Sequence, residues 1–235
     1  MEQIMVIGGL VKTTCLDYPG HLAAAVFAAG CPYSCFYCHN RSLISTEHRN
    51  EAFAAQVIYR FLEKRKGLLE GVVITGGEPS LQNSLKDFLI PVKQLGYKIK
   101  LDTNGSRPET IADLISSSLV DYLALDVKAP WGRYQEICGG HADCSAVQES
   151  LKILESSCIP WEVRTTVCPT LTEEDLLIIS SEVPSAVRIW RWNLYRKPNL
   201  FLPEDAWRVH AASLQEAKLL EFSESLHTSF RIEIS

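Results

Sequence analysis

Three of the chain's eight cysteines lie close together in the stretch Ala29 to Asn40, where they could hold one metal centre. Cys31, Cys35 and Cys38 follow a C-x3-C-x2-C spacing. Thiolates this close in sequence converge only if the backbone wraps around a common centre, so the spacing predicts a tight loop folded on a metal. Three thiolates leave one coordination position open, and an open position lets a metal or cluster bind a substrate directly.

The same residues fit two other kinds of metal site. Cys35, Cys38 and His39 match the C-x-x-C-H pattern of covalent haem attachment. Adding Cys31 to these three gives a donor set for a structural zinc site. Haem attachment is disfavoured because the first residues, with an acid at Glu2, show no export signal. A structural zinc site would leave the polar motifs described below without a role.

The other five cysteines do not repeat this spacing. Because the chain is large, carries clustered cysteines and shows no secretory signal, metal binding is favoured over disulfides. We expect the five to be small buried or surface residues, with a second metal role left open for the pair in Cys-Gly-Gly-His-Ala-Asp-Cys. The five are Cys15, Cys138, Cys144, Cys158 and Cys168.

Charge and hydropathy exclude several classes of partner. The chain has 23 Lys and Arg against 28 Asp and Glu, a formal net charge of −5, and no basic stripe of the kind that binds nucleic acid. The longest apolar run, Leu22 to Ala29, is far shorter than the roughly 20 residues that span a bilayer. We therefore expect a cytoplasmic protein that binds neither nucleic acid nor membrane.

Buried strands alternate with amphipathic helices along the chain, after an entry segment at residues 4–20. The predicted strands are 22–29, 71–75, 97–103, 120–127, 161–167 and 187–193, with a short terminal strand at 230–234. Helices are predicted at 50–66, 108–119 and 204–222. A further helix is capped by Ser80 and ended by Gly96. Another begins at a capping box of Ser145 with Gln148 and ends at residue 157, and one more is capped by Thr172 with Asp175.

This order of elements predicts the α/β fold class. Each strand–helix–strand unit is a right-handed crossover, so neighbouring strands run parallel. Six such units predict a partial (β/α)6 barrel of the TIM-like kind, whereas a closed barrel has eight. No linker or low-complexity segment divides the chain, so residues 1–235 are expected to form one domain.

Polar side chains gather where the predicted strands end. Parallel α/β folds build their active sites at the carboxyl ends of their strands, so one mouth is expected to carry the function. The residues at or just past these ends are Asn40, Glu78, Asp102, Asn104, Asp126 and Lys128.

Taken together, the motifs resemble those of the radical S-adenosylmethionine enzymes. The cysteine spacing is joined by Gly76–Pro79 (GGEP) after the second strand and by Thr103–Gly105 (TNG) after the third. Within that superfamily, Leu16–Gly20 (LDYPG), Tyr37–Asn40 (YCHN) and Asp126–Lys128 (DVK) are similar to the glycyl-radical enzyme activating enzymes, of the anaerobic ribonucleoside-triphosphate reductase and pyruvate formate-lyase types. Each motif alone is an ordinary turn, and the joint order carries the resemblance.

The resemblance implies a cofactor, a reaction and partners. Cys31, Cys35 and Cys38 would hold a 4Fe-4S cluster whose fourth iron binds S-adenosylmethionine. Reductive cleavage would give a 5′-deoxyadenosyl radical, which takes a hydrogen atom from a backbone glycine of a glycyl-radical enzyme. A flavodoxin or ferredoxin-type protein would supply the electron. Residues 39–71 contain no further cysteine, so a single cluster is implied.

The resemblance also assigns residues around the ligand. The Gly-Gly-Glu-Pro strand edge would receive the methionine amino group, with the glycines permitting close approach and Glu78 accepting from the ammonium. Tyr37 would lie near the adenine and Asn104 near the carboxylate or ribose. The implied ligand contacts are Tyr37, Gly76, Gly77, Glu78, Pro79, Asn104, Asp126, Lys128 and Arg164.

A monovalent cation is implied beside the ligand's carboxylate. In the pyruvate formate-lyase activators this ion is held by oxygen ligands, which suit a hard cation. The matching positions here are Asp102, Thr103 and Asp126.

Two alternative functions stay open. The segment Ile189 to Asn193 departs from the pattern of the pyruvate formate-lyase activators, so the partner enzyme is not identified. One alternative is 7-carboxy-7-deazaguanine synthase, a small radical enzyme that acts on a small molecule. The other is a non-catalytic metal-binding or electron-transfer module.

Overall fold

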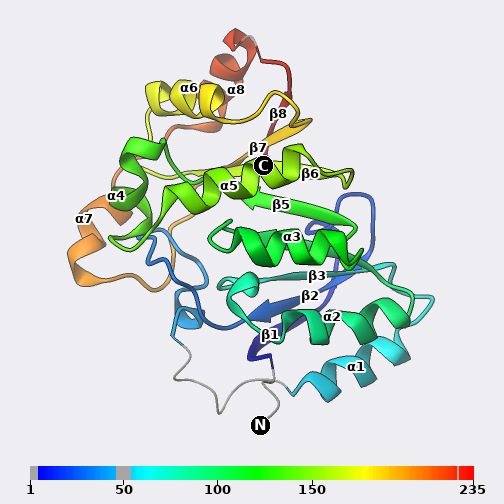
Figure 1. Ribbon diagram of the computed structural model, residues 1–235. Coiled ribbons are helices and arrows are strands. Elements are labelled where there is room, and N and C mark those ends of the chain that lie inside the picture. The colour runs from blue at the N-terminus through cyan, green and yellow to red at the C-terminus, as the bar shows by residue number, and fades with distance from the viewer. Residues whose placement is uncertain (1–4, 46–53, 227) are drawn as a thin grey trace.

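The computed structural model describes residues 5–45, 54–226 and 228–235. Eight strands of these residues form one sheet, in which the spatial order follows the order along the chain (Figure 1). The strands are β1 (Ile7–Thr14), β2 (Ala23–Ala28), β3 (Gly71–Gly76), β4 (Lys98–Thr103), β5 (Tyr122–Asp126), β6 (Trp161–Val167), β7 (Ile189–Leu194) and β8 (Arg231–Ile234).

The sheet is an open partial barrel. Strands β2 to β8 pair in parallel, and β1 pairs with β2 in the antiparallel direction. In the parallel register Ala28 lies opposite Gly76, and Thr103 opposite Leu125, so these strands end at one edge. Strands β1 and β8 are the two edges of the sheet. The predicted α/β class with parallel strands in a partial barrel is therefore confirmed.

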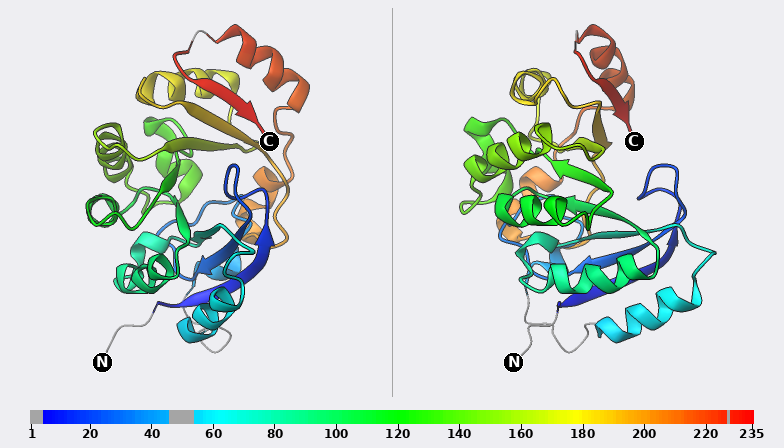
Figure 2. Two further views of the ribbon diagram at one scale, coloured as in Figure 1. Left: turned by 90° about the vertical axis from the view of Figure 1, so that its right-hand side faces the viewer. Right: turned by 45° about the vertical axis from the view of Figure 1, so that its right-hand side comes forward.

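Helices return the chain between the parallel strands and lie along the outer side of the curved sheet (Figure 2). The helices are α1 (Ala55–Lys64), α2 (Leu85–Gln94), α3 (Pro108–Ser116), α4 (Tyr134–Cys138), α5 (Cys144–Glu155), α6 (Glu173–Glu182), α7 (Ala206–Val209) and α8 (Glu216–Ser225). Short 3-10 turns are η1 (Arg41–Leu43), η3 (Pro79–Leu81), η4 (Trp131–Arg133) and η5 (Pro203–Asp205).

Alternation along the strands separates two environments. Val72 and Ile74 of β3 point outward into the main apolar core beneath the helices. Val73, between them, points into the barrel, where it packs with Tyr18 and Ala25. Burial of an aliphatic side chain of this size contributes about 1.5–3 kcal/mol. The outer core therefore carries most of the stability, and the inner face is free to carry polar residues.

The tryptophans divide between core and surface. Trp190 and Trp192 of β7 are fully buried in the outer core, where their rings meet edge to face at a centroid distance of 5.1 Å. Trp207 of α7 is 72% exposed.

Four local predictions were wrong. Ser80 does not cap a helix: it lies within η3, and α2 begins at Leu85 after Ser84. The entry segment contains a full strand, β1. It was not predicted because it lies at the edge of the sheet and contains two glycines. The last predicted helix is divided into η5, α7 and α8. Helix α5 is capped by the carboxylate of Asp143, which accepts from the backbone N–H of Ser145 at 2.9 Å, because Asp143 and not Ser145 is the last residue before the helix.

Other local predictions were confirmed. Thr172 and Asp175 form the capping box of α6. Gly96 follows α2 with a φ of 92°, and α1 ends before Gly67, whose φ is 79°. Residues 50–53 of the predicted first helix lie outside the described residues. No helix in the described part of the chain is long and apolar enough to cross a membrane.

Candidate active site

The cysteine loop follows β2 and is tied to its surroundings by backbone hydrogen bonds. The N–H of Gly30 donates to the carbonyl of Leu43 at 2.7 Å, and the side chain of Asn40 donates to the carbonyl of Gly76 at 3.0 Å. The N–H of Ser34 donates to the carbonyl of Cys138 in α4 at 2.9 Å. Figure 1 shows this loop beside α4 and α7, at the edge where the parallel strands end.

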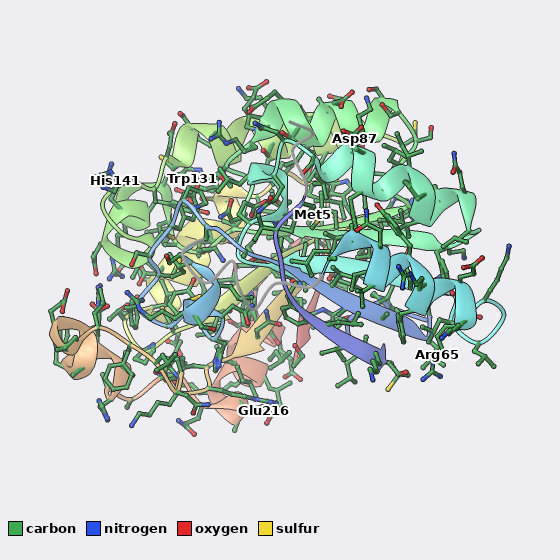
Figure 3. The ribbon with its side chains drawn as sticks, turned by 90° about the horizontal axis from the view of Figure 1, so that it is seen from below. Met5, Arg65, Asp87, Trp131, His141 and Glu216 are labelled. Atoms are coloured by element: carbon green, nitrogen blue, oxygen red, sulfur yellow. The ribbon has the colours of Figure 1, made fainter. Side chains whose placement is uncertain are left out.

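Figure 3 shows the two ends of the barrel from below. Trp131 and His141, which belong to the segments after β5, lie at one end of the molecule. Arg65, at the end of α1, lies at the other. The helices thus run back along the sheet from the site end to the far end, as parallel crossovers require.

A cavity of about 330 Å³ opens at the site end. All three clustered cysteines line it, and so do residues at or near the carboxyl ends of β3, β4, β5 and β6. The predicted residues that line it are Cys31, Cys35, Cys38, Tyr37, Gly76, Gly77, Glu78, Asp102, Thr103, Asn104, Asp126, Lys128 and Arg164. Pro79 is buried in η3 and is not part of the lining. The fold therefore brings the sequence motifs to one mouth.

The cysteines share the cavity without forming a site for a single ion. Among the described residues, no three His, Cys, Asp or Glu side chains are grouped as ligands of one metal ion. A 4Fe-4S cluster needs no such convergence, because each thiolate binds a different iron atom. Three thiolates that share an open cavity fit a cluster whose fourth iron is free to bind a ligand.

The thiols differ in their surroundings. Burial raises the pKa of Cys31 to about 12 and also raises the pKa of Cys38. A hydrogen bond with the thiol of Cys138 lowers the pKa of Cys35. The side-chain amide of Asn104 lies 3.7 Å from the Sγ of Cys31. Iron must therefore displace protons from at least Cys31 and Cys38 when it binds at neutral pH.

Glu78 joins the loops that follow β3 and β4. Its side chain is fully buried and accepts four hydrogen bonds. The donors are the N–H of Asn104 at 2.6 Å, the hydroxyl of Thr103 at 2.7 Å, and the N–H and hydroxyl of Ser80 at 3.0 and 2.5 Å. Burial raises the pKa of Glu78, against the effect of these donors. The carboxylate thus positions Asn104 beside the cysteines.

The glycines of the Gly-Gly-Glu-Pro motif make room for the cysteine loop. Gly76 has a φ of 115°, and a Cβ there would lie 2.5 Å from the carbonyl oxygen of Ala28. A Cβ on Gly77 would lie 2.3 Å from the carbonyl oxygen of Gly30. The close approach that the sequence predicted is therefore made by the chain's own backbone.

Tyr37 has an unsatisfied polar atom at the cavity. Its side chain is buried, and its hydroxyl has no hydrogen-bond partner among the described residues. Burial raises the pKa of Tyr37 well above its usual value, so the hydroxyl remains a donor. A buried polar atom without a partner is costly, and a ligand in the cavity could satisfy it.

Charged residues of β4, β5 and β6, together with Lys128, form a set of linked ion pairs. Arg164 of β6 donates to the carboxylate of Asp102 at 3.0 Å and to that of Asp126 at 2.9 Å. Lys128 donates to the second oxygen of Asp126 at 2.9 Å, and Lys100 donates to the second oxygen of Asp102 at 2.5 Å. Burial would raise the pKa of Asp126, but Arg164 and Lys128 hold it at about 2. Both carboxylates are therefore ionised at neutral pH.

This pairing leaves no free carboxylate oxygen for the implied monovalent cation. All four oxygens of Asp102 and Asp126 already face an ammonium or guanidinium group. The hydroxyl of Thr103 is directed to Glu78. These residues do not fit a site for a separate cation.

Several lining residues were not singled out as candidates by the sequence. Thr75, Thr166 and Asn193 lie at strand ends on the inner face, as period-two alternation from Val73, Arg164 and Arg191 would have indicated. Phe27 and Tyr33 flank the cysteine loop, and their aromatic character carried no signal. Asp17 comes from the loop before β2 and belongs to the Leu16–Gly20 motif, which was part of the resemblance but was given no place at the site.

Comparison with known proteins places this site in a family. The model of the Radical SAM superfamily matches residues 25–181. A Methanocaldococcus jannaschii protein that is provisionally named a glycyl-radical enzyme activating enzyme is 32% identical over 227 residues, which cover 93% of this chain and 89% of that protein. The pyruvate formate-lyase-activating enzyme of Streptococcus mutans is 26% identical over 86% of this chain and 81% of its own length.

The fold is similar to that of a solved structure. The crystal structure of Streptococcus suis SuiB bound to S-adenosylmethionine superposes with a TM-score of 0.69 at 15% identity, over 88% of this chain and 48% of that one. Membership implies a 4Fe-4S cluster and S-adenosylmethionine, and the cysteine-lined cavity fits both. The chain belongs to the radical S-adenosylmethionine superfamily and is an enzyme of that chemistry.

Proposed function

We propose that this enzyme generates a glycyl radical on a partner enzyme of the anaerobic ribonucleotide reductase or pyruvate formate-lyase type. The observation that carries the proposal is the similarity to a glycyl-radical activating enzyme over nearly the full length of both chains. The absence of further cysteines between residues 39 and 71 agrees with a single-cluster activating enzyme.

In this proposal Cys31, Cys35 and Cys38 hold the 4Fe-4S cluster, and S-adenosylmethionine binds in the adjoining part of the cavity. When bound, the reduced cluster supplies the electron that cleaves S-adenosylmethionine to a 5′-deoxyadenosyl radical, which abstracts a glycine hydrogen atom. A flavodoxin or ferredoxin-type protein delivers the electron, and residues 1–235 act as one domain.

The chain's own residues prepare the site for this ligand. Glu78 fixes the loop of Asn104, so the amide of Asn104 is aimed at the cavity before the ligand arrives. Tyr37 offers a hydroxyl that lacks a protein partner. Lys128 and Arg164 present fixed positive charge toward the ligand's carboxylate, held in place by Asp126. Gly76, Gly77 and Pro79 keep the strand edge close to the cysteine loop.

Electron paramagnetic resonance tests the proposal. The protein is reconstituted anaerobically with iron and sulfide, reduced, and mixed with S-adenosylmethionine and each glycyl-radical enzyme of the host. We expect 5′-deoxyadenosine together with a glycyl-radical signal that is lost when the partner's glycine is replaced by alanine.

The alternatives give different results in the same assay. A 7-carboxy-7-deazaguanine synthase would act on a small molecule and would produce no glycyl-radical signal with any glycyl-radical enzyme. A non-catalytic metal or electron-transfer module would bind iron without releasing 5′-deoxyadenosine. Either result would overturn the proposed function.

A further inference from the structure

Lys100 is a lysine buried inside the barrel. It is 1% exposed, and it precedes Asp102 by two residues on the same inner face of β4. Its ammonium nitrogen lies 2.5 Å from one carboxylate oxygen of Asp102 and 6.0 Å from the ring centroid of Tyr122. Lysine is almost never fully buried unless it is paired, so this position has a specific electrostatic reason.

The ammonium pairs with a carboxylate that the family resemblance assigns to a mobile ion. Asp102 and Asp126 were expected to bind a monovalent cation, yet Lys100 occupies the oxygen of Asp102 that Arg164 leaves free. An ammonium group carries the same single charge as a potassium ion and has a similar radius. The side chain of Lys100 therefore supplies, by covalent attachment, what a bound ion would supply.

Lys100 belongs to a linked group of charges on the inner face of the barrel. The linked group around Arg164 contains three cations and two carboxylates, and an adjoining group joins Arg191 to Glu162 and Glu233. Removal of the Lys100 ammonium leaves one carboxylate oxygen of the buried Asp102 without its partner, and a buried charge that lacks a partner is costly. The cations of the two groups are Lys100, Lys128, Arg164 and Arg191, with Arg231 also paired to Glu233, and the anions are Asp102, Asp126, Glu162 and Glu233.

We propose that Lys100 is an internal replacement for the monovalent cation, so that this enzyme binds S-adenosylmethionine without an added potassium or sodium ion. Lys100 is a positioning residue: it holds Asp102, which holds one end of the Arg164 guanidinium. The inference rests on the binding of S-adenosylmethionine and is independent of which glycyl-radical enzyme is the partner.

The variant Lys100→Met isolates the ammonium. Methionine keeps the length of the lysine stem but lacks its last atom, so it vacates the ammonium position and leaves the apolar packing. Lys98→Met, on the same strand two residues away and exposed, is the matched control.

The experiment measures S-adenosylmethionine affinity by calorimetry on reconstituted protein without reductant or partner, in potassium chloride and in choline chloride of equal ionic strength. We expect wild type and Lys98→Met to bind equally in both salts. Lys100→Met should bind about tenfold more weakly in choline chloride and recover in potassium chloride. Its melting temperature should rise by about 2–4 °C in potassium relative to choline, and that of wild type should not.

Each contrary result is informative. A wild type that needs potassium for binding overturns the inference, and this arm requires no variant to fold. A Lys100→Met protein that is weakened equally in all salts also overturns it, because a purely structural lysine would behave in that way. Absence of S-adenosylmethionine binding in every salt would instead overturn the proposed function.

Discussion

The carboxylate of Glu78 accepts the backbone N–H of Asn104 at 2.6 Å, which fastens the loop after β3 to the loop after β4. The two residues are 26 positions apart, and both line the cavity beside the cysteines. The resemblance gave Glu78 the role of accepting a ligand ammonium. The geometry adds a structural role, since the same carboxylate is the common acceptor of four donors from its own chain.

Replacement of Glu78 separates these two roles. Glu78→Gln keeps the shape of the side chain but replaces one acceptor oxygen with an NH2 group. That group then faces a backbone or hydroxyl donor with which it cannot form a hydrogen bond, so the free energy of unfolding should fall by about 1–3 kcal/mol. Glu78→Ala removes every acceptor and should cost more. Urea unfolding measures the stability, and calorimetry measures S-adenosylmethionine affinity. A Glu78→Gln protein of wild-type stability that no longer binds the ligand would show that the carboxylate serves the ligand alone.

Gly77→Ala should disturb the cysteine loop. Because the new Cβ would lie 2.3 Å from the carbonyl oxygen of Gly30, the backbone of one loop must move. We expect a fall in bound iron after reconstitution to less than about half that of wild type, with a loss of about 2–4 kcal/mol in stability. Gly132→Ala is the control, since no atom lies within 4 Å of its Cβ position. Full iron content in Gly77→Ala would mean that the two loops need not be in contact.

The fold was predictable where local patterns are strong. The buried runs and helical spacings predicted all seven parallel strands, β2 to β8, and the edge at which they end, because period and turn residues are local signals. Strand β1 was not predicted because an exposed edge strand with two adjacent glycines, Gly8 and Gly9, has no clear alternation of apolar and polar residues. The break between α7 and α8 was not predicted because residues 210–215 contain neither proline nor glycine.

The site was predictable as a set of residues and not as a set of contacts. Motif order placed the cysteines and Glu78, Asn104 and Arg164 at one mouth, where the structure has them. Alternation along β4 puts Lys100 and Asp102 on one face, but nothing local indicates that Arg164 would reach across to Asp102, or that the space beside Gly77 would be taken by Gly30. Such pairings depend on the register of neighbouring strands, which tertiary packing decides.

The ionised state of Asp126 should stabilise the fold above about pH 4. Its pKa is about 2 in the folded protein, where Arg164 and Lys128 outweigh the effect of burial, against an ordinary value of 3.8. Because the folded pKa is the lower one, the contribution is complete above the unfolded value and is lost as the pH falls toward 2, with a size of about 2 kcal/mol.

Asp126→Asn tests this pH dependence by chemical denaturation. At neutral pH the variant should be less stable than wild type by about 2 kcal/mol or more, since Arg164 and Lys128 lose a shared partner. The difference should shrink as the pH falls from 4 to 2. Asp113→Asn removes an exposed carboxylate and serves as the control. A gap that stays constant down to pH 2 would show that Asp126 acts by packing and not by charge.

Cys35→Ala should remove the cluster and leave the barrel folded. Cys35 is buried at the edge of the apolar core, and Cys31 and Cys38 pack against that core. The substitution removes only a sulfur atom, and the loop is also held by hydrogen bonds from Ser34 and Asn40 that involve no thiol. We expect bound iron and 5′-deoxyadenosine release to fall to background, with an unchanged far-ultraviolet circular dichroism spectrum. Cys158→Ala, an exposed cysteine outside the cavity, should retain both. Unfolding of Cys35→Ala would mean that the metal centre is structural, because only then does the fold depend on the metal.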